Sequence, residues 1–571
     1  MQYRLSCANP HAQSLEIELT LNKLKGTRLV LQLPAWRPGR YELANFAKNV
    51  RTFAAFDAQE RPLKWEKVAK DRWEIRIGKA KSVTVRYTYY ARQMDGGGSW
   101  IDETQWYLNF INFALYAEDR LDEPCDVILD VPRHYQVACG MKALSKHHLR
   151  AENYYQLVDS PLIASDSLQH FTYEAEGIPF HVWIQGNWTP DWPQMHMAFQ
   201  LFSEKQIQTF GEFPEPEYHF LIQALPWKFY HGVEHRNSTA IVLGPDYELS
   251  QPFLYRELLG VSSHELYHAW NVVRIRPAEM MPYDFARENY FRTGFVAEGV
   301  TTYCGDLFLA RAGVFSLEEY LMELNKLLQR HFLNYGRLNL SVADSSFDTW
   351  LDGYTPGIPH RKGSIYVEGA VAALILDLEL RELTQGERSL DDVMRIMWDE
   401  FGRVGRGYTV ADYQEALERV AGKKMKEYVD TCLFGTVDLS PRLRRALHTV
   451  GLSLHEISPD LLSERQWGVR TSFRDGSLRV EATAPGSPAE RVLCRDDELI
   501  ALNGIRLQNN LEALLHTQPS PEAVELTLFR NHRLQQVTLA ADGQTYFAVH
   551  QVRLPAQVTG DQARRRHEWL G

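Results

Sequence analysis

The sequence is poor in cysteine and has no long apolar run. Its six cysteines among 571 residues show no paired spacing, which argues against a disulfide framework or a CxxC zinc site and predicts reduced thiols. The longest apolar stretch, residues 370–376, ends at Asp377 and predicts a buried helix, because a bilayer-spanning helix needs roughly 18 such residues. The first residues also lack the apolar core of a signal peptide. We therefore expect a cytoplasmic protein without a transmembrane segment, while a chain trimmed of its leader would begin in the same way.

Basic charge is scarce as well. Lys and Arg number 62 against 73 Asp and Glu, so the formal net charge is −11, which disfavours a nucleic-acid partner. Hydrophobic residues make up 44% and charged residues 24%, values typical of globular proteins rather than disordered or fibrous ones. At about 100–200 residues per domain, a chain of this length predicts several structural units. We expect a multidomain α+β protein.

Residues 1–175 have the alternation of β-strands. Residues 73–77 and 83–89 are runs of β-branched and aromatic residues with a period of two, and Pro and Gly separate such runs. This pattern predicts an N-terminal β-sandwich-like domain.

The pattern becomes helical from about residue 250 to 455, inside a second domain expected at 176–460. Ser316 opens a capping box before an expected helix at 317–328, and Ser389 and Thr409 are expected N-caps of two further helices. This second domain is predicted to be mostly α-helical.

Strands return in residues 465–552. A strand at 478–482 leads to Pro-Gly-Ser-Pro-Ala at 485–489, where a short helix should begin near Ser487, and then to a strand that ends in an Asn-Gly turn. This order resembles a PDZ domain, with Asp496 where that family usually has glycine, and implies a separable module with a peptide or protein ligand. The remaining C-terminal tail, 553–571, is expected to be polar and frayed.

The segment His264-Glu265-Leu266-Tyr267-His268 predicts a metal centre. Positions i and i+4 share one helix face, so both imidazoles can bind one zinc ion, and Glu265 is placed to take a proton from water activated by the metal. Glu298, followed by glycine, is the best third ligand and leaves one coordination position open. The alternatives are two buried histidines that bind no metal and a Glu298 that only stabilises a helix N-terminus. We expect one Zn²⁺ per chain.

Residues 264–277 resemble the "HE..H.WN..R..P" block of the glycyl aminopeptidase family, PDZ-containing, thermolysin-like zinc peptidases of the gluzincin type. Residues 36–41, Trp-Arg-Pro-Gly-Arg-Tyr, are similar to that family's N-terminal "W.PGSY", with Arg40 in place of serine. The resemblance therefore extends over most of the chain. It implies a thermolysin-like catalytic domain at 176–460 and a metallopeptidase that hydrolyses peptides.

Two further motifs extend this resemblance. Residues 231–239 are similar to the family's "GG.EHRNS" loop, which implies that Gly232 and Glu234 bind substrate and that the Glu234 carboxylate receives its α-ammonium group. Without the resemblance, Glu234 would be interpreted as a solvated carboxylate. His231 replaces the first glycine of the motif.

Residues 366–370 resemble the "Y..KGA" turn, in which the tyrosine, here Tyr366, donates a hydrogen bond to the oxyanion. Glu368 replaces the usual lysine. The alternatives are that Tyr366 is only a core aromatic or that the nearby Tyr354 has this role.

Three functions remain open at this level. The first is a zinc aminopeptidase that removes small N-terminal residues, Gly or Ala by family resemblance. The second is a zinc endopeptidase without amine recognition, and the third is a catalytically weak, PDZ-bearing peptide-binding protein. The intact His264, Glu265, His268 and Glu298 argue against the third, and Glu234 distinguishes the first two.

Overall fold

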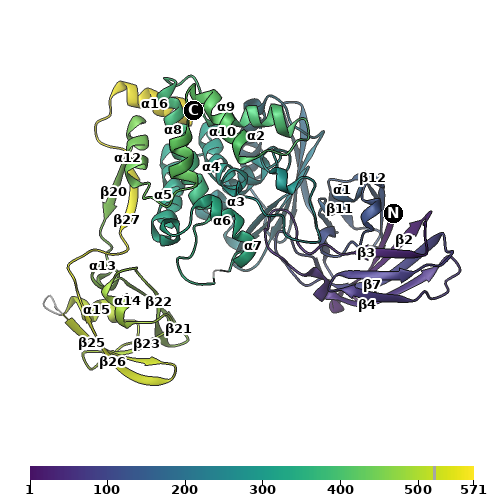
Figure 1. The fold of residues 1–571 in the computed structure, drawn as a ribbon, viewed down its shortest axis with the longest axis horizontal. Coiled ribbons are helices and arrows are strands. Elements are labelled where there is room, and N and C mark those ends of the chain that lie inside the picture. The colour runs from purple at the N-terminus through teal and green to yellow at the C-terminus, as the bar shows by residue number, and fades with distance from the viewer. Residues whose placement is uncertain (356, 518–522) are drawn as a thin grey trace.

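The computed structural model describes residues 1–355, 357–517 and 523–571. The N-terminal unit, at the right of Figure 1, consists mainly of strands. Its seven-stranded sheet has the order β12 (Lys142–Ser145), β13 (His148–Ala151), β10 (Cys125–Leu129), β1 (Gln2–Ser6), β2 (Ser14–Asn22), β7 (Ser82–Tyr90) and β4 (Val50–Asp57). A three-stranded sheet has the order β3 (Arg28–Gln32), β6 (Arg72–Arg76) and β5 (Trp65–Ala69). A four-stranded sheet has the order β11 (Gln136–Cys139), β14 (Leu162–Ser165), β9 (Gln105–Leu108) and β8 (Trp100–Ile101). A short helix, α1 (Tyr154–Val158), precedes β14.

Alternating side chains explain this sheet formation. In β2, Leu15, Ile17, Leu19 and Leu21 are all buried while the residues between them are only partly buried. A strand with this period buries one face against a core and leaves the other toward solvent. The predicted N-terminal β-rich domain is confirmed.

A five-stranded sheet connects the N-terminal unit to the helical body. Its order is β15 (Gln169–Ala175), β16 (Ile178–Gln185), β17 (Tyr218–Ala224), β19 (Ser238–Gly244) and β18 (Phe229–Glu234). Strands β16, β17 and β19 are parallel, whereas β18 runs antiparallel to β19 at the end of this order. One face, including Phe220 and Ile222, packs into the core of the helical body, and the other brings Leu221 against Tyr107 and Ile163 of the N-terminal unit.

The helical body lies at the centre of Figure 1. Its helices are α2 (Trp192–Phe210), α3 (Pro252–Tyr267), α4 (Thr301–Arg311), α5 (Leu317–Leu333), α6 (Val342–Phe347), α7 (Thr349–Asp352), α8 (Ile365–Leu383), α9 (Leu390–Met397), α10 (Val410–Ala421), α11 (Lys426–Tyr428) and α12 (Ser440–Thr449). The predicted mostly helical region is confirmed. Ser316, Ser389 and Thr409 each cap a helix through a capping box, and the helix that follows Ser316 is five residues longer than expected.

A two-stranded antiparallel ribbon, β20 (Ser453–Ile457) and β27 (Val549–Arg553), connects the C-terminal unit to the helical body (Figure 1). Between them lie α13 (Leu462–Trp467), α14 (Pro488–Val492) and α15 (Leu511–His516), together with a sheet of β21 (Val469–Arg474), β22 (Ser477–Thr483), β23 (Glu498–Leu502), β24 (Ile505–Arg506), β25 (Ala523–Arg530) and β26 (Arg533–Ala540). Ser487 caps α14, and both residues of the Asn503-Gly504 turn have positive φ, as a tight hairpin turn requires.

The expectation of a frayed C-terminal tail was wrong. Residues Gly560–Leu570 form helix α16, capped by Thr559, and the chain returns to the helical body beside α4 and α12 (Figure 1). Trp569 is fully buried, and its indole N–H donates a hydrogen bond to the Tyr303 hydroxyl at 2.7 Å. The helix is largely polar except for Trp569 and Leu570 at its end, and the burial of these two side chains stabilises it. The polar composition of the rest of the segment led to the wrong expectation.

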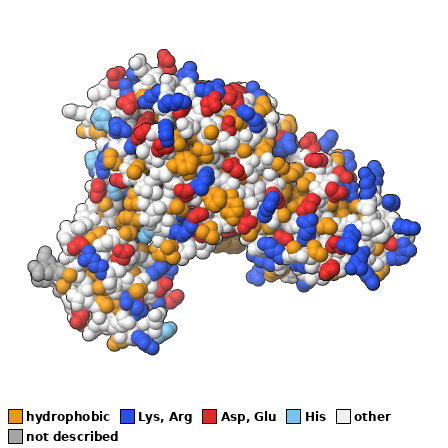
Figure 2. Space-filling model, viewed as in Figure 1, with side chains coloured by type: hydrophobic (Ala, Val, Ile, Leu, Met, Phe, Trp, Pro, Cys, Tyr) orange, Lys and Arg blue, Asp and Glu red, His pale blue; other side chains and the backbone are white. Residues whose placement is uncertain are grey.

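Among the described residues, no helix is long and apolar enough to cross a membrane. Lys, Arg, Asp and Glu side chains are interspersed over the face shown in Figure 2.

Candidate functional site

Helix α3 carries His264 and Glu265, and His268 immediately follows it as the C-cap. The Nε2 atoms of His264 and His268 lie 3.1 Å apart. Nδ1 of His268 donates a hydrogen bond to the Asn271 carbonyl at 2.8 Å, so Nε2 is the ring nitrogen that faces Glu298 and His264. The spacing of four residues therefore places two imidazole nitrogens at one point, as the sequence predicts.

Glu298 reaches the same point from a second element. It lies in a π-helical segment, Phe295–Val300, that continues into α4, and its Oε2 is 3.4 Å from Nε2 of His268. The ligand atoms of His264, His268 and Glu298 all lie within 4.8 Å of one another. The sequence thus identified all three members of a group that can hold a metal ion.

Two glycines allow the Glu298 segment to approach α8. A Cβ atom on Gly299 would clash with Gly369 of α8, and a Cβ on Gly369 would lie 2.7 Å from the Gly299 Cα. The backbones of the two segments therefore touch directly, and only glycine fits at this crossing. This contact places Tyr366, in the first turn of α8, near Glu298.

Glu234 and Glu265 complete the cluster. Glu234 is the last residue of the edge strand β18, and its carboxylate, that of Glu265 and the His268 imidazole offer atoms within 4.8 Å of one another. A Cβ on Gly232 would clash with the Glu265 carboxylate, and a Cβ on Gly39 would lie 2.5 Å from Oε2 of Glu234. The glycines of both family-like motifs therefore make room for carboxylates.

The cluster has an excess of buried negative charge. Burial and the neighbouring Glu234 and Glu298 raise the pKa of Glu265 well above its ordinary value, although His268 acts in the opposite direction. Burial by itself would lower the pKa of His268, but the three carboxylates raise it to about 10. Oε2 of Glu265 is buried without a hydrogen-bond partner in the described part of the chain.

This donor set fits a zinc ion. Two imidazole nitrogens and one carboxylate are a common catalytic zinc ligand set, and a divalent cation would compensate the buried carboxylates. Burial lowers the pKa of His264 well below its ordinary value and favours the neutral imidazole that binds a metal, whereas the carboxylates that raise the pKa of His268 are those that a bound cation would compensate.

Tyr366 and Tyr354 lie together beside the cluster. Their hydroxyl groups are 3.2 Å apart, and the Tyr354 hydroxyl also accepts a hydrogen bond of 3.5 Å from the backbone N–H of Tyr41. Burial, followed by Glu298 and Tyr354, raises the pKa of Tyr366 well above its ordinary value, so its phenol stays protonated as a donor. The two tyrosines that the sequence left as competitors form one pair.

The two residues that depart from the family motifs, His231 and Glu368, each have a hydrogen-bond partner. Nδ1 of His231 accepts a hydrogen bond from the Gly96 N–H at 3.2 Å, and burial lowers the pKa of His231 to about 4, so this ring is neutral. Glu368 is buried and accepts a 2.6 Å hydrogen bond from Nδ1 of His331 in α5. Its carboxylate thus ties the start of α8 to a neighbouring helix.

Sequence reasoning missed two residues that orient the cluster. The Tyr41 hydroxyl donates to Oε1 of Glu298 at 2.9 Å, and the Asn271 side chain donates to the Val296 carbonyl at 2.8 Å and to the Thr301 hydroxyl at 2.9 Å. Tyr41 and Asn271 both stand inside the motifs at 36–41 and 264–277, which was the available signal. The contact between Tyr41 and Glu298 cannot be inferred from spacing, because the two residues belong to different units of the fold.

A second group with metal-ligand chemistry, His181, Glu217 and His219, lies at β16 and β17. The Trp183 indole N–H donates to Nδ1 of His219 at 3.2 Å, so the neutral ring carries its proton on Nε2, the atom that faces Glu217. In this tautomer Nε2 of His219, 3.4 Å from Oε1 of Glu217, carries a proton and offers no lone pair to a metal there.

Comparison with known families finds two matches. Residues 2–166 match the Peptidase M61 N-terminal domain, and residues 257–372 match the M61 glycyl aminopeptidase domain. The second match includes His264, His268, Glu298 and Tyr366, whereas Glu234 precedes it. No curated protein sequence matches the chain.

Comparison with solved structures gives a match over the whole chain. It is the crystal structure of an aminopeptidase N family protein from Idiomarina loihiensis, with a TM-score of 0.91, 25% identity and 100% of both chains covered. An M1 zinc metallopeptidase from Deinococcus radiodurans, a variant bound to a Tyr-Ser-Ala substrate, matches with a TM-score of 0.46 and 15% identity over 76% of this chain and 94% of that one. The fold class defined here is therefore that of the aminopeptidase N family protein, an N-terminal β-rich unit followed by a helical body. Residues 2–166 and 257–372 thus match M61 peptidase domains on this fold, and these matches support a peptidase.

Proposed function

We propose that this protein is a zinc-dependent aminopeptidase. The observation that carries the proposal is the position of Glu234 at the end of the edge strand β18. A carboxylate oxygen of Glu234 lies within 4.8 Å of a carboxylate oxygen of Glu265 and of a ring nitrogen of His268. A carboxylate buried at this distance suits the α-ammonium group of a peptide whose first carbonyl lies at the metal. An endopeptidase site has no need of such a group, since its substrates carry no charge there.

The residues divide the work as follows. His264, His268 and Glu298 would hold the zinc ion, which when bound polarises the substrate carbonyl and lowers the pKa of a water molecule. Glu265 accepts the proton of the attacking water and delivers it to the leaving amine, and its raised pKa suits both transfers. Tyr366, hydrogen-bonded to Tyr354, donates to the oxygen on which negative charge develops.

Strand β18 aligns the substrate. It is the last strand in the order of its sheet among the described residues, so a peptide can extend the sheet along it. Gly232, at the closest approach to Glu265, keeps this part of the strand free of a side chain. The preference for Gly or Ala at the first position rests on the M61 glycyl aminopeptidase match.

The proposal predicts a strict need for a free amine. Glu234→Ala should lower kcat/KM for Gly and Ala substrates at least about 100-fold, because an unpaired ammonium group in a buried site costs several kcal/mol. Zinc content should not change. N-acetylation of the substrate should be as damaging to the wild-type enzyme, and Glu248→Ala, an exposed carboxylate in the same region, is the matched control.

Hydrolysis of N-acetylated peptides at the rate of free ones would refute amine recognition and favour the endopeptidase. Absence of any hydrolysis by the zinc-loaded wild-type protein would favour the peptide-binding protein instead.

For the C-terminal unit we propose a PDZ-type role, in which the edge of the sheet pairs with a peptide strand. The support is the sequence of strand β22, capped helix α14, strand β23 and Asn-Gly turn. Its ligand would be the end of a partner or of a substrate protein.

A further inference from the structure

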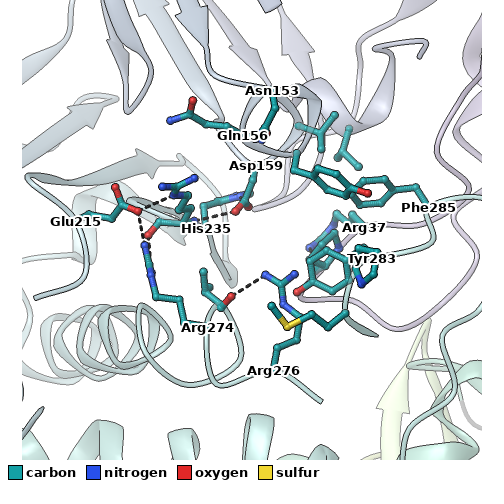
Figure 3. A pocket seen from close by; sticks show the side chains of 18 of the residues that line it. Arg37, Asn153, Gln156, Asp159, Glu215, His235, Arg274, Arg276, Tyr283 and Phe285 are labelled. Carbon is teal, nitrogen blue, oxygen red and sulfur yellow. Dashed lines mark hydrogen bonds and ion pairs between the residues drawn. The ribbon is translucent and has the colours of Figure 1, made fainter. Parts of the chain in front are cut away.

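A cavity of about 410 Å³ lies between the N-terminal unit and the helical body (Figure 3). Arg37 and Asp159 line it from the N-terminal side, and His235, Arg276 and Tyr283 from the other. Its volume is within the range of about 300–1,000 Å³ typical of small-molecule sites. None of the proposed zinc ligands lines it, so it is distinct from the site described above.

The cavity is nevertheless a direct neighbour of that site. Arg37 and Pro38, which line it, precede Gly39, the residue in contact with the Glu234 carboxylate, and His235 directly follows Glu234. A ligand in this cavity would therefore lie next to the chain segments that carry Gly39 and Glu234, the proposed amine-binding position.

The charged residues of the cavity carry an excess of positive charge, in a chain whose net charge is −11. Four guanidinium groups face two carboxylates there, namely Arg37, Arg236, Arg274 and Arg276 against Asp159 and Glu215. The Asp95 carboxylate, outside the lining, lies near Arg37 and offsets its charge, and the remaining positive charge favours an anionic ligand.

Arg276 carries most of this excess. Glu215 pairs with Arg236 at 2.6 Å and with Arg274 at 2.5 Å, whereas Arg276 forms no ion pair with any carboxylate of the described residues. Its Nη2 donates to the Val273 carbonyl at 2.7 Å, and its guanidinium carbon lies 3.9 Å from the Tyr283 ring centre. Figure 3 shows Arg276 and Arg37 reaching the same part of the cavity beside Tyr283. The remaining N–H groups of Arg276 suit a planar, bidentate acceptor such as a carboxylate.

His235 adds an unused acceptor. With Nδ1 donating to Asp159 at 2.8 Å, the neutral ring carries a lone pair on Nε2. The side chain is only 7% exposed, and Nε2 is buried with no hydrogen-bond partner among the residues described. Such an atom requires a donor, which a ligand can supply through an N–H group.

Part of the remaining wall is apolar, beside the polar side chains of Asn153 and Gln156. Ile111, Val158, Val273 and Phe285 contribute side chains to the cavity, and these suit an organic body better than a free inorganic anion.

We propose that this cavity binds a small N-acyl amino acid or the C-terminal residue of a short peptide. The carboxylate pairs with the Arg276 guanidinium, the adjacent amide N–H donates to Nε2 of His235, and the side chain contacts the apolar wall. This proposal stands apart from the peptidase assignment, since it needs neither zinc nor turnover.

Calorimetric titration with N-acetylphenylalanine tests the proposal, with N-acetylphenylalanine amide as the matched neutral probe. Loss of the charge-assisted contact should weaken binding about tenfold or more, so both the amide on the wild-type protein and N-acetylphenylalanine on Arg276→Gln should show this loss. Arg276→Lys, which keeps the charge without the planar fork, should be intermediate. Arg403→Gln, an arginine outside the cavity, should bind as the wild type does.

The zinc-stripped protein must retain the affinity. Loss of binding on zinc removal would show that the carboxylate binds the metal and would overturn the proposal. Equal binding of acid and amide, no detectable binding to the wild type, or an undiminished affinity of Arg276→Gln would each overturn it as well. Inorganic phosphate that binds as tightly as N-acetylphenylalanine would refute the organic ligand class. If Arg276→Gln fails to fold, as judged by thermal unfolding, the comparison of acid with amide and the Arg276→Lys variant decide.

Discussion

The Tyr41→Phe variant tests whether the N-terminal unit helps to build the metal centre. The Tyr41 hydroxyl donates a 2.9 Å hydrogen bond to Oε1 of Glu298, and both residues are buried. Phenylalanine keeps the ring in its contacts with Phe291 and Trp350, whose centres lie 4.9 and 6.2 Å away, and removes only the donor.

The expected magnitude follows from the charge on the acceptor. A hydrogen bond to a charged group contributes about 1.5–3 kcal/mol, and about 1.4 kcal/mol corresponds to a tenfold change in an equilibrium constant. We therefore expect the affinity for zinc to fall about 10- to 100-fold, the range seen when a hydrogen bond that orients a metal ligand is removed. Competition between the protein and a chromophoric chelator at fixed pH measures this Kd.

Tyr3→Phe is the matched control. The Tyr3 hydroxyl is also buried and donates a 2.7 Å hydrogen bond, but to the Leu115 carbonyl in the core of the N-terminal unit. Tyr3→Phe should lower the unfolding temperature and leave the Kd for zinc unchanged. An unchanged Kd in Tyr41→Phe, or an equal loss in both variants, would refute the idea that Tyr41 orients a zinc ligand.

Three further predictions concern turnover and modularity. Glu265→Gln should retain zinc and lose nearly all kcat, because an amide accepts no proton from the attacking water; wild-type turnover would exclude Glu265 as the base. Tyr366→Phe should lower kcat about 100-fold with little change in KM. Tyr354→Phe, which removes only the partner hydroxyl group, should lower kcat less. A larger loss of kcat in Tyr354→Phe than in Tyr366→Phe would show that Tyr354 is the donor to the oxyanion. Replacing residues 459–547 by a short Gly-Ser linker should preserve hydrolysis of short peptides, because Ile457 and Val549 are paired neighbours in the β20–β27 ribbon and α16 is retained. Loss of that activity in a folded, zinc-loaded protein would contradict a separable C-terminal unit.

Much of the candidate metal centre could be predicted because its signals are local. His264 and His268 share a helix face through the 3.6-residue period alone, and Ser316 identifies the start of α5 through a contact within one turn. The strand–turn–helix order near Ser487 is equally local. The C-terminal helix escaped prediction because its stability comes from the burial of Trp569 against Tyr303, a residue 266 positions away.

The sequence by itself determined the identity of the metal-ligand candidates and of the proposed general base, since their chemistry and spacing are encoded in short segments. Only the tertiary structure decided how these segments meet. The hydrogen bond from Tyr41 to Glu298 joins residues 257 positions apart, and the contact of Gly299 with Gly369 brings α8 against the Glu298 segment. The physical reason is that a hydrogen bond or a close backbone approach between distant segments depends on the packing of whole units. No local periodicity records such packing.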